Sequence, residues 1–495
     1  MYYDLVVDIL DYCRDDYGQL FRCSLVNREF NRAASNMLYY RVVLSPPISR
    51  LHQLNLRDTG AITSPSNLPS ATLPRYAEMV VELEVSGFLN PRAPPRNTLH
   101  ALLSDALRKF TSICSVKFTP ATYHEDVFTD SLKLLPNFAG SLREVALNAS
   151  CTSDERSVSL LTGIQGLSKI ALYSPGRAIL QLLPEWLEKN ASTLTELHLF
   201  DNCGSVTPGV LKSFLPHVQE NLKAFSLGLS YSITDEDLFT FLSQLPNIEH
   251  LRLRNYWQMK EPTHKPGLRK LKSFTADYGG GATSFNTCVE VSRFCRWVRR
   301  TIAASPIQSL RIIAGDEEQV HGGDDLGIEG GESAPSYYVL PANPAFDSLV
   351  EHLVRKHAST LQHLHIRSAF VSLTAIRSLF THCRALESVH MSVGNTAMDL
   401  LSELLPDVPS LHSAAFEIRN IRPRSLKFGE EEALALMQRG PRLRRLAVNG
   451  RRWEGSWKVT PEVGKGSHGE VSIFSVEELR PVVPPWRRTN HVAGS

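Results

Sequence analysis

The chain is 495 residues long and carries 53 lysines and arginines against 51 aspartates and glutamates, which gives a formal net charge of +2. A charge so close to zero gives no general case for nucleic acid or an anionic membrane as the main partner. With 42% hydrophobic and 21% charged residues the composition is typical of a globular protein, and no apolar run approaches the roughly 20 residues of a membrane-spanning helix.

The first forty-odd residues predict three short amphipathic helices. Their apolar residues recur at helical spacing: Leu5, Ile9 and Leu10, then Phe21, Leu25 and Val26, then Phe30, Ala33 and Ala34. Helices this small cannot bury a full core alone, so we expect them to leave an apolar face for a partner.

This segment resembles the F-box family, whose loose signature is a Leu-Pro-x-Glu-Ile-x-x-x-Ile-Leu start followed by a Cys-x-x-Val-x-x-x-Trp helix. Leu5, Ile9 and Leu10 match the start, and Cys23, Val26 and Phe30 match the second part, with Phe30 in the place of the Trp. Met1 and Tyr2 stand where Leu-Pro would be, so the opening turn of the motif is missing or altered. The open alternative is that these helices only cap the domain that follows.

The resemblance implies that the segment docks on the small adaptor subunit of an SCF-type cullin–RING ubiquitin ligase. The residues expected to make that contact, or to form the core that supports it, are Leu5, Ile9, Leu10, Leu25, Val26 and Phe30.

The rest of the chain repeats the unit Leu-x-x-Leu-x-Leu, with other apolar residues allowed at each place. Successive starts differ by 25, 27, 28 and 26 residues between 142 and 248, which is the spacing of leucine-rich repeats. The copies lie at 80–85, 113–118, 142–147, 167–172, 194–199, 222–227, 248–253, 271–276 (less regular), 307–312, 361–366, 386–391, 411–416 and 443–448.

Each unit predicts a short strand followed by a helix that covers it. The last two apolar residues of a unit alternate, so both point to one side of a strand, and Leu238, Phe241, Leu242 and Leu245 show a covering helix. Because one unit cannot bury its apolar side alone, the units should stack into a solenoid with a parallel sheet inside. Prolines near the predicted helix ends read as stops: Pro136, Pro184, Pro216, Pro246 and Pro406.

The predicted class is therefore α/β, with a three-helix F-box-like domain at 1–44, a leucine-rich-repeat solenoid at 45–452 and a cap or tail at 453–495. The alternative is an ordinary doubly wound α/β domain. The pairing of the two parts resembles the F-box/leucine-rich-repeat family, especially its divergent fungal members.

Two segments interrupt or end the repeats. Residues 315–344 hold seven acids and no Lys or Arg, which predicts an acidic, Gly-rich loop leaving the solenoid; the acids do not follow a calcium-loop pattern. In the tail, residues 464–471 match the Gly-x-Gly-x-x-Gly-x-Val loop of protein kinases, but only 24 residues follow Val471 and no other kinase motif is present. An enzyme that uses this loop is the least favoured hypothesis.

Arginines and histidines recur at the strand positions between the apolar ones, and these positions should face the concave side of the solenoid. A solvated strand face is one interpretation. The other is a substrate-binding surface for an acidic or phosphorylated segment, because Arg forks suit carboxylates and phosphates. Its candidate residues are His198, Phe200, His250, Arg252, Arg254, Arg311, His363, His365, Arg367 and His390.

Eight cysteines form no Cys-x-x-Cys pair and have no His at zinc-finger spacing, which favours small buried hydrophobes in a reducing compartment, cytoplasmic or nuclear. No catalytic arrangement, metal site or cofactor site is predicted.

The sequence thus predicts a non-catalytic substrate-recognition adaptor in ubiquitin-dependent protein catabolism, whose repeats hold a protein substrate while other subunits transfer ubiquitin. The alternative is a repeat scaffold for protein binding that is independent of ubiquitination.

Overall fold

The computed structural model describes residues 3–14, 16–44, 68–88, 96–122, 127–255, 262–278, 288–314, 344–419, 428–461 and 470–479. They form two compact units, the first reaching to Ile233 and the second beginning at Thr234. Among these residues no helix is both long and apolar enough to span a membrane.

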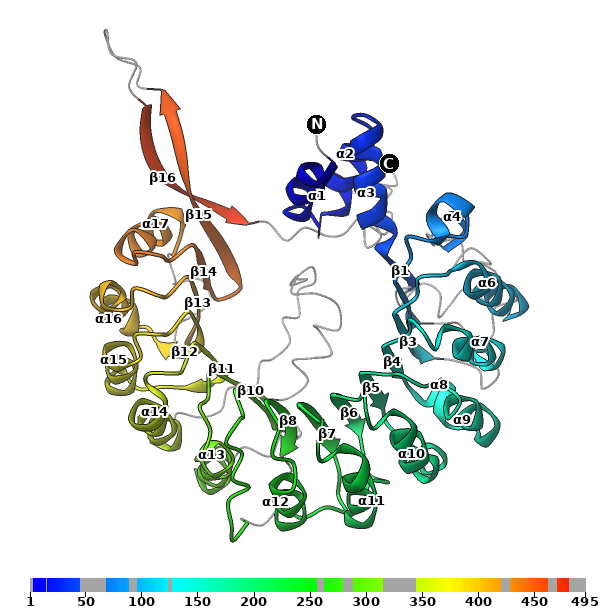
Figure 1. Ribbon diagram of the computed structural model, residues 1–495. Coiled ribbons are helices and arrows are strands. Elements are labelled where there is room, and N and C mark those ends of the chain that lie inside the picture. The colour runs from blue at the N-terminus through cyan, green and yellow to red at the C-terminus, as the bar shows by residue number, and fades with distance from the viewer. Residues whose placement is uncertain are drawn as a thin grey trace, which may run out of the picture. The chain divides into compact units, whose positions relative to one another are not determined.

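The first unit opens with helices α1 (Tyr3–Asp11), α2 (Tyr17–Ser24) and α3 (Arg28–Tyr40), and strand β1 (Arg41–Leu44) follows α3 directly (Figure 1). The strands pair in parallel in chain order. They are β2 (Glu82–Phe88), β3 (Ser115–Thr122), β4 (Glu144–Leu147), β5 (Lys169–Tyr173), β6 (Glu196–Asn202) and β7 (Ala224–Leu229). The helical elements after β1 are α4 (Leu68–Ala71), α5 (Pro74–Ala77), α6 (Arg96–Lys109), α7 (Thr129–Leu134), the 3₁₀ helix η3 (Leu135–Phe138), α8 (Ala149–Thr152), α9 (Glu155–Leu161), α10 (Arg177–Asn190) and α11 (Pro208–Val218).

The second unit continues the same alternation of strand and helix. Its strands are β8 (His250–Asn255), β9 (Ser273–Tyr278), β10 (Ser309–Ala314), β11 (His363–Phe370), β12 (Ser388–Gly394), β13 (Ser413–Arg419) and β14 (Arg445–Val448), parallel in chain order, followed by the antiparallel β15 (Arg451–Pro461) and β16 (Glu470–Leu479). Its helices are α12 (Asp235–Ser243), α13 (Cys288–Ile302), α14 (Pro344–His357), α15 (Leu373–His382), α16 (Ala397–Leu404), the 3₁₀ helix η5 (Leu405–Asp407) and α17 (Glu430–Arg439).

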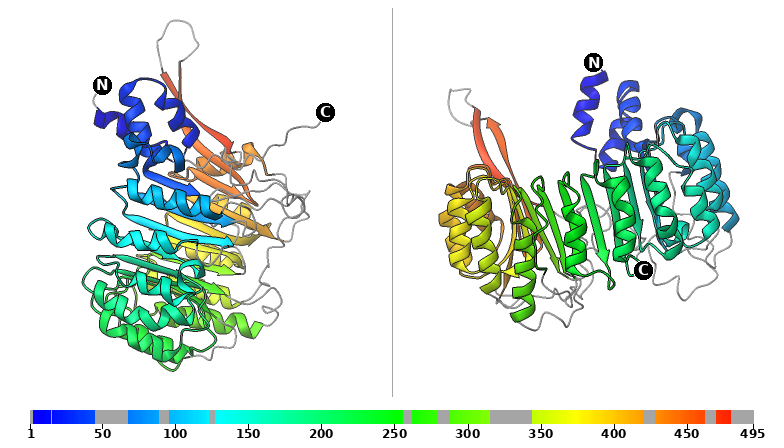
Figure 2. Two further views of the ribbon diagram at one scale, coloured as in Figure 1. Left: turned by 90° about the vertical axis from the view of Figure 1, so that its right-hand side faces the viewer. Right: turned by 60° about the horizontal axis from the view of Figure 1, so that its bottom comes forward.

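The repeat prediction is confirmed copy by copy. Each strand from β2 to β14 begins two residues after the first apolar residue of a predicted unit. The two alternating apolar residues of each unit are buried, from Leu83 and Val85 in β2 to Leu446 and Val448 in β14. In each unit the helices stack side by side on the face to which these residues point (Figure 2). The fold is a mixed α/β leucine-rich-repeat solenoid, as predicted.

Two of the expected helix stops lie inside helices. Pro216 is in the last turn of α11, near its end as predicted, but the prediction for Pro184 is wrong. Pro184 lies inside α10 instead of ending it. The second half of the helix is held by packing, since Trp186 and Leu187 are fully buried and the Trp186 indole N–H donates to the Ile164 carbonyl at 3.0 Å. This burial outweighs the backbone hydrogen bond that a proline removes from a helix interior, a loss of about 3 kcal/mol.

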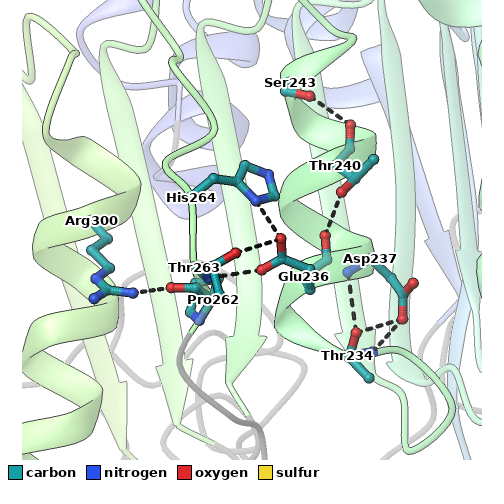
Figure 3. A network of polar contacts seen from close by, with 9 residues as sticks. All are labelled: Thr234, Glu236, Asp237, Thr240, Ser243, Pro262, Thr263, His264 and Arg300. Atoms are coloured by element: carbon teal, nitrogen blue, oxygen red, sulfur yellow. Dashed lines mark hydrogen bonds and ion pairs between the residues drawn. The ribbon is translucent and has the colours of Figure 1, made fainter.

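The less regular repeat at 271–276 has a structural explanation. Residues 262–272, the described part of the connection between β8 and β9, contain no helix. Polar contacts anchor this segment between the neighbouring helices (Figure 3). The Glu236 carboxylate in α12 accepts from Thr263 N at 2.8 Å and from Thr263 Oγ1 at 2.9 Å, and lies 2.7 Å from His264 Nδ1. Arg300 of α13 donates to the Pro262 carbonyl.

The described part of the predicted tail is a hairpin of β15 and β16 that pairs with β14. Trp453 of β15 is buried, and its ring centroid lies 5.2 Å from that of Phe428. The hairpin therefore covers the last parallel strand. The acidic segment 315–343 and the Gly-rich turn 464–469 lie outside the described residues.

Candidate protein-interaction surfaces

The three N-terminal helices enclose a small core of their own. Val6, Leu10, Leu20, Ala33 and Ala34 are buried together at its centre. Phe30 is half-buried and packs against them. Of the six residues predicted for adaptor docking, Leu10 and Phe30 therefore belong to the supporting core.

The other four point to solvent. The exposed fraction is 50% for Leu5, 43% for Ile9, 70% for Leu25 and 64% for Val26. Phe21, which the predicted docking set did not include, is exposed as well. We call Leu5, Ile9, Phe21, Leu25 and Val26 the N-terminal apolar set. Large exposed apolar side chains on one small helical element are typical of a protein-interaction site.

Helix caps fix the corner that presents Leu25 and Val26. The Asn27 side chain caps α3 by accepting from the Phe30 amide at 2.9 Å. The Asn31 amide donates to the Ser24 carbonyl at 2.8 Å and so ties α3 to the end of α2. Because Asn is among the best N-cap residues, this short turn is held in one conformation with both apolar side chains outward.

The strand face opposite the helices differs in chemistry between the two units. In the first unit it carries what we call the charge ladder, in which acids and bases alternate across neighbouring strands. Its members are Arg41, Glu82, Glu84, Lys117, Glu144, Lys169, Glu196 and His198.

Glu84 is the most buried acid of the ladder. It lies 2.6 Å from Arg41 Nη2 and 3.1 Å from Lys117 Nζ. Burial alone would raise the pKa of the Glu84 carboxyl, but the hydrogen bond from Arg41 and the charge of Lys117 bring that pKa below its ordinary value.

The rest of the ladder is also paired. Lys169 lies between Glu144 at 3.8 Å and Glu196 at 3.6 Å. His198 lies 3.1 Å from Glu196 and 2.8 Å from Ser226, and it stacks on Phe200 with ring centroids 5.3 Å apart. His198 and Phe200, both predicted as substrate-binding residues, are thus engaged with their own strand neighbours. The candidate binding residues chosen from the sequence included His198 and left out the acids of this face, such as Glu196.

In the second unit the same strand positions carry mostly bases. The register aligns Arg252 of β8, Thr275 of β9, Arg311 of β10, His365 of β11 and His390 of β12 in one row across the sheet. Eight of the residues predicted from the sequence as substrate-binding lie on this face, which spans the five neighbouring strands β8 to β12. We call these eight the basic face: His250, Arg252, Arg254, Arg311, His363, His365, Arg367 and His390.

Among the described residues, two acids lie close to these bases. Asp277 is 3.9 Å from Arg252, and Glu417 is shared by Arg367 at 3.1 Å and His390 at 3.8 Å. Arg311 and His250 are exposed, and neither forms an ion pair with any residue in the described part of the chain. The basic face therefore has four arginines against two carboxylates, whereas the ladder has three Lys and Arg residues against four carboxylates.

The described residues offer no group of three His, Cys, Asp or Glu side chains that could hold a metal ion. Four of the cysteines are buried, and burial raises the pKa of the Cys151, Cys203 and Cys295 thiols to about 12 and that of Cys383 to about 11. Thiols with such pKa values are poor nucleophiles, in line with the sequence interpretation of small buried hydrophobes.

The chain matches no protein-family model, and no curated protein matches it by sequence. Among solved structures it is similar to the yeast complex of Rad7 and Elc1, with 13% identity over 91% of this chain and 93% of that chain and a TM-score of 0.44. It is also similar to the TLR13–ssRNA13 complex, with 12% identity over 76% of this chain and 55% of that chain and a TM-score of 0.32. At such low identities and TM-scores, these similarities say nothing about the function of this chain.

Proposed function

We propose that this protein is the substrate-recognition adaptor of an SCF-type cullin–RING ubiquitin ligase. The observation that carries the proposal is the N-terminal apolar set, which is exposed on α1, α2 and the turn after α2. These residues belong to a three-helix segment that resembles an F-box and already has a core of its own. Apolar residues placed in this way gain free energy mainly by burial against a partner. The partner that the resemblance implies is the small adaptor subunit.

In this proposal the solenoid holds a protein substrate and the chain itself catalyses no reaction. Other subunits of the ligase transfer ubiquitin, and this chain contributes proximity and orientation. It would act in the cytoplasm or the nucleus, where such ligases work and where its buried thiols stay reduced.

The alternative is a scaffold whose N-terminal helices only cap the repeats, and one set of contacts favours it. Tyr39 of α3 stacks on Tyr76 of α5 with ring centroids 4.0 Å apart, and β1 continues directly from α3 into the sheet. The helices are thus joined to the repeats as a cap would be. A cap, however, does not require exposed apolar residues on its outer side.

Co-elution of the purified full chain with the SCF adaptor subunit tests the proposal. We expect a stable complex that Val26→Asp weakens by about 2 kcal/mol or more, roughly 30-fold in Kd, because a charge would be buried at the contact. Val289→Asp is the matched control, since Val289 in α13 is 66% exposed against 64% for Val26. Absence of a complex with the unmodified chain would leave the cap as the function of the helices.

Point variants are better suited to this test than truncation. A chain that starts at residue 45 also loses β1, and with it the pairing to β2 and the Arg41–Glu84 contact of 2.6 Å. Its failure to bind would then report damage to the solenoid as well as loss of the helices.

A further inference from the structure

The basic face of the second unit carries positive charge that its own residues leave partly uncompensated. Arg311 lies in the middle of the aligned row, between Thr275 of β9 and His365 of β11. Its side chain is exposed and forms no ion pair within the described residues. Neither neighbour in the row carries a negative charge, so the guanidinium is available to a ligand.

Elsewhere on the face, two acids of the described residues lie beside the bases. The carboxylate of Glu417 serves both Arg367 and His390, and Asp277 stands at 3.9 Å from Arg252, longer than a direct hydrogen bond. Arg254, two residues along the same strand, makes no ion pair within the described part of the chain. At Arg311 a carboxylate-bearing ligand could therefore form charge-assisted hydrogen bonds without first breaking an ion pair of the described residues.

The repeat itself does not require this charge excess. The first unit has the same strands with the same outward positions, yet its ladder places a carboxylate beside each base. Both faces satisfy the fold, since the apolar residues beneath them are buried equally. The excess is a property of the second unit alone.

We propose that the basic face binds an acidic, unmodified segment of a partner protein, namely a run of Asp and Glu in an extended conformation that crosses the strands. The proposal deepens the proposed function, because the segment would belong to the substrate. Neighbouring strands are about 4.8 Å apart, so the bases from β8 to β12 spread over about 19 Å. An extended chain covers that span with about six residues at roughly 3.3 Å each.

The spread of the bases favours a run of carboxylates over a single phosphate. One phosphate is recognised by arginines that converge on a single point. Here the arginines come from three different strands: Arg252 from β8, Arg311 from β10 and Arg367 from β11. Several acids in succession match such a distribution, and each contributes a modest, salt-sensitive attraction.

Fluorescence anisotropy with a labelled hexaglutamate peptide and the full chain tests this proposal. We expect binding that weakens with added salt, and no binding of a labelled hexaglutamine peptide. Arg311→Glu should weaken the hexaglutamate complex about tenfold or more. Arg377→Glu is the control, because it makes the same charge change on helix α15, where the Arg377 side chain is 60% exposed.

Four results would overturn the proposal. These are no binding of hexaglutamate, equal binding of hexaglutamine, equal weakening by Arg377→Glu, and tighter binding of a hexaglutamine peptide that carries one phosphoserine, which would indicate a phosphate site. A variant that lacks residues 316–332 tests whether the protein's own acidic segment competes with the peptide. If only that chain binds hexaglutamate, the occupant is the protein's own acidic segment and not a partner.

The Val26→Asp variant separates this proposal from the ligase role. We expect it to bind hexaglutamate like the unmodified chain, because Val26 lies in the first unit, outside the basic face. Peptide binding without any adaptor complex would retain the acidic-ligand surface and reject the ubiquitin-ligase adaptor.

Discussion

The outward strand faces of the two units share one repeat and differ in charge. In the first unit the ladder pairs each base with a carboxylate, as Lys169 shows between Glu144 and Glu196. In the second unit Arg311 of β10 is aligned with Thr275 of β9 and His365 of β11 and has no carboxylate at either aligned position. The repeat therefore constrains the residues at the buried strand positions, whereas the outward positions can differ in charge without changing the fold.

The two strand faces should also differ in how much they contribute to the stability of their units. Most pairs of the ladder are solvent-exposed, and such pairs contribute roughly 0–1 kcal/mol each. Glu84 is the exception, because its side chain is 11% exposed and contacts bases from both neighbouring strands. The ladder therefore stabilises its unit mainly at Glu84. On the basic face, Arg311 has no ion pair among the described residues, so it should contribute binding capacity and little stability.

Among the single substitutions, the largest effect on stability should come from Glu84→Ala. It leaves Arg41 and Lys117 facing each other without their shared carboxylate, and we expect the free energy of unfolding to fall by about 2 kcal/mol, less than for a fully buried pair because both bases are partly exposed. Urea denaturation followed by circular dichroism measures this. Glu144→Ala, whose carboxylate is 3.8 Å from Lys169, is the control and should cost under about 0.5 kcal/mol. Equal losses of stability in the two variants would contradict the prediction that Glu84 stabilises the ladder more than its exposed acids do.

Acid should distinguish the two units next. His352 of α14 is buried beside His357 in the second unit. Burial, the His357 ring and the positive charges of Arg299, Arg355 and Lys356 lower the pKa of His352 from 6.5 to about 4. The folded state thus binds its proton less readily than the unfolded state does, so stability falls as the pH drops from about 6.5 towards 4, by at most roughly 3 kcal/mol.

The first unit should respond at lower pH. The pKa of Glu84 is below its ordinary value of 4.5, so the stability that this carboxylate contributes is present above pH 4.5 and lost as the pH falls through the lowered pKa. Hydrogen exchange resolved by peptide should therefore show the second unit loosening first on acidification. His352→Leu should flatten the response of the second unit between pH 6.5 and 4, and an unchanged response would assign the acid sensitivity to other groups.

Much of the fold could be predicted from the sequence because the buried strand positions recur with a fixed period. Leu197 and Leu199, for example, were placed correctly by spacing alone, and so were their counterparts in each repeat. Strand β1 was missed, although Tyr39, Val42 and Leu44 have the repeat spacing, because the first two of these also fit the preceding helical segment. Without β1, the pairing of Arg41 with Glu84 could not be predicted either.

The candidate surfaces were predictable in part for a similar reason. Alternation along a strand places Arg252 and Arg311 outward, so the basic face follows from the sequence. Whether a base is neutralised depends on which residues of neighbouring strands align with it. The prediction did not align the repeats with one another, so it did not place Lys169 between Glu144 of β4 and Glu196 of β6. Leu10 and Leu25 are both apolar at helical spacing, and only three-dimensional packing separates the buried one from the exposed one.

A smaller and local effect is expected in the connection between β8 and β9, whose described residues 262–272 contain no helix. Glu236→Ala removes the carboxylate that holds Thr263 and His264, so the Thr263 amide should exchange with solvent several-fold faster while global unfolding changes little. Glu431→Ala, in the first turn of α17, is the control. Unchanged exchange at Thr263 would mean that the buried Leu268 and Leu271 hold this segment by themselves.

The smallest change in stability should follow from Arg311→Ala. This side chain is exposed and has no ion pair among the described residues, so its removal should alter the free energy of unfolding by no more than about 0.5 kcal/mol, and a small gain is expected because fewer positive charges then face one another. Lys117→Ala is the comparison in the ladder. It takes one of two bases from Glu84 and should cost more, about 1 kcal/mol. Denaturation curves and hexaglutamate binding should be measured for both variants. Lys117→Ala should lose stability and keep its affinity for the peptide, whereas Arg311→Ala should keep its stability and lose affinity. If Arg311→Ala instead destabilised its unit as much as Lys117→Ala, the arginine would be part of the fold, and the charge excess of the second unit would no longer point to a ligand.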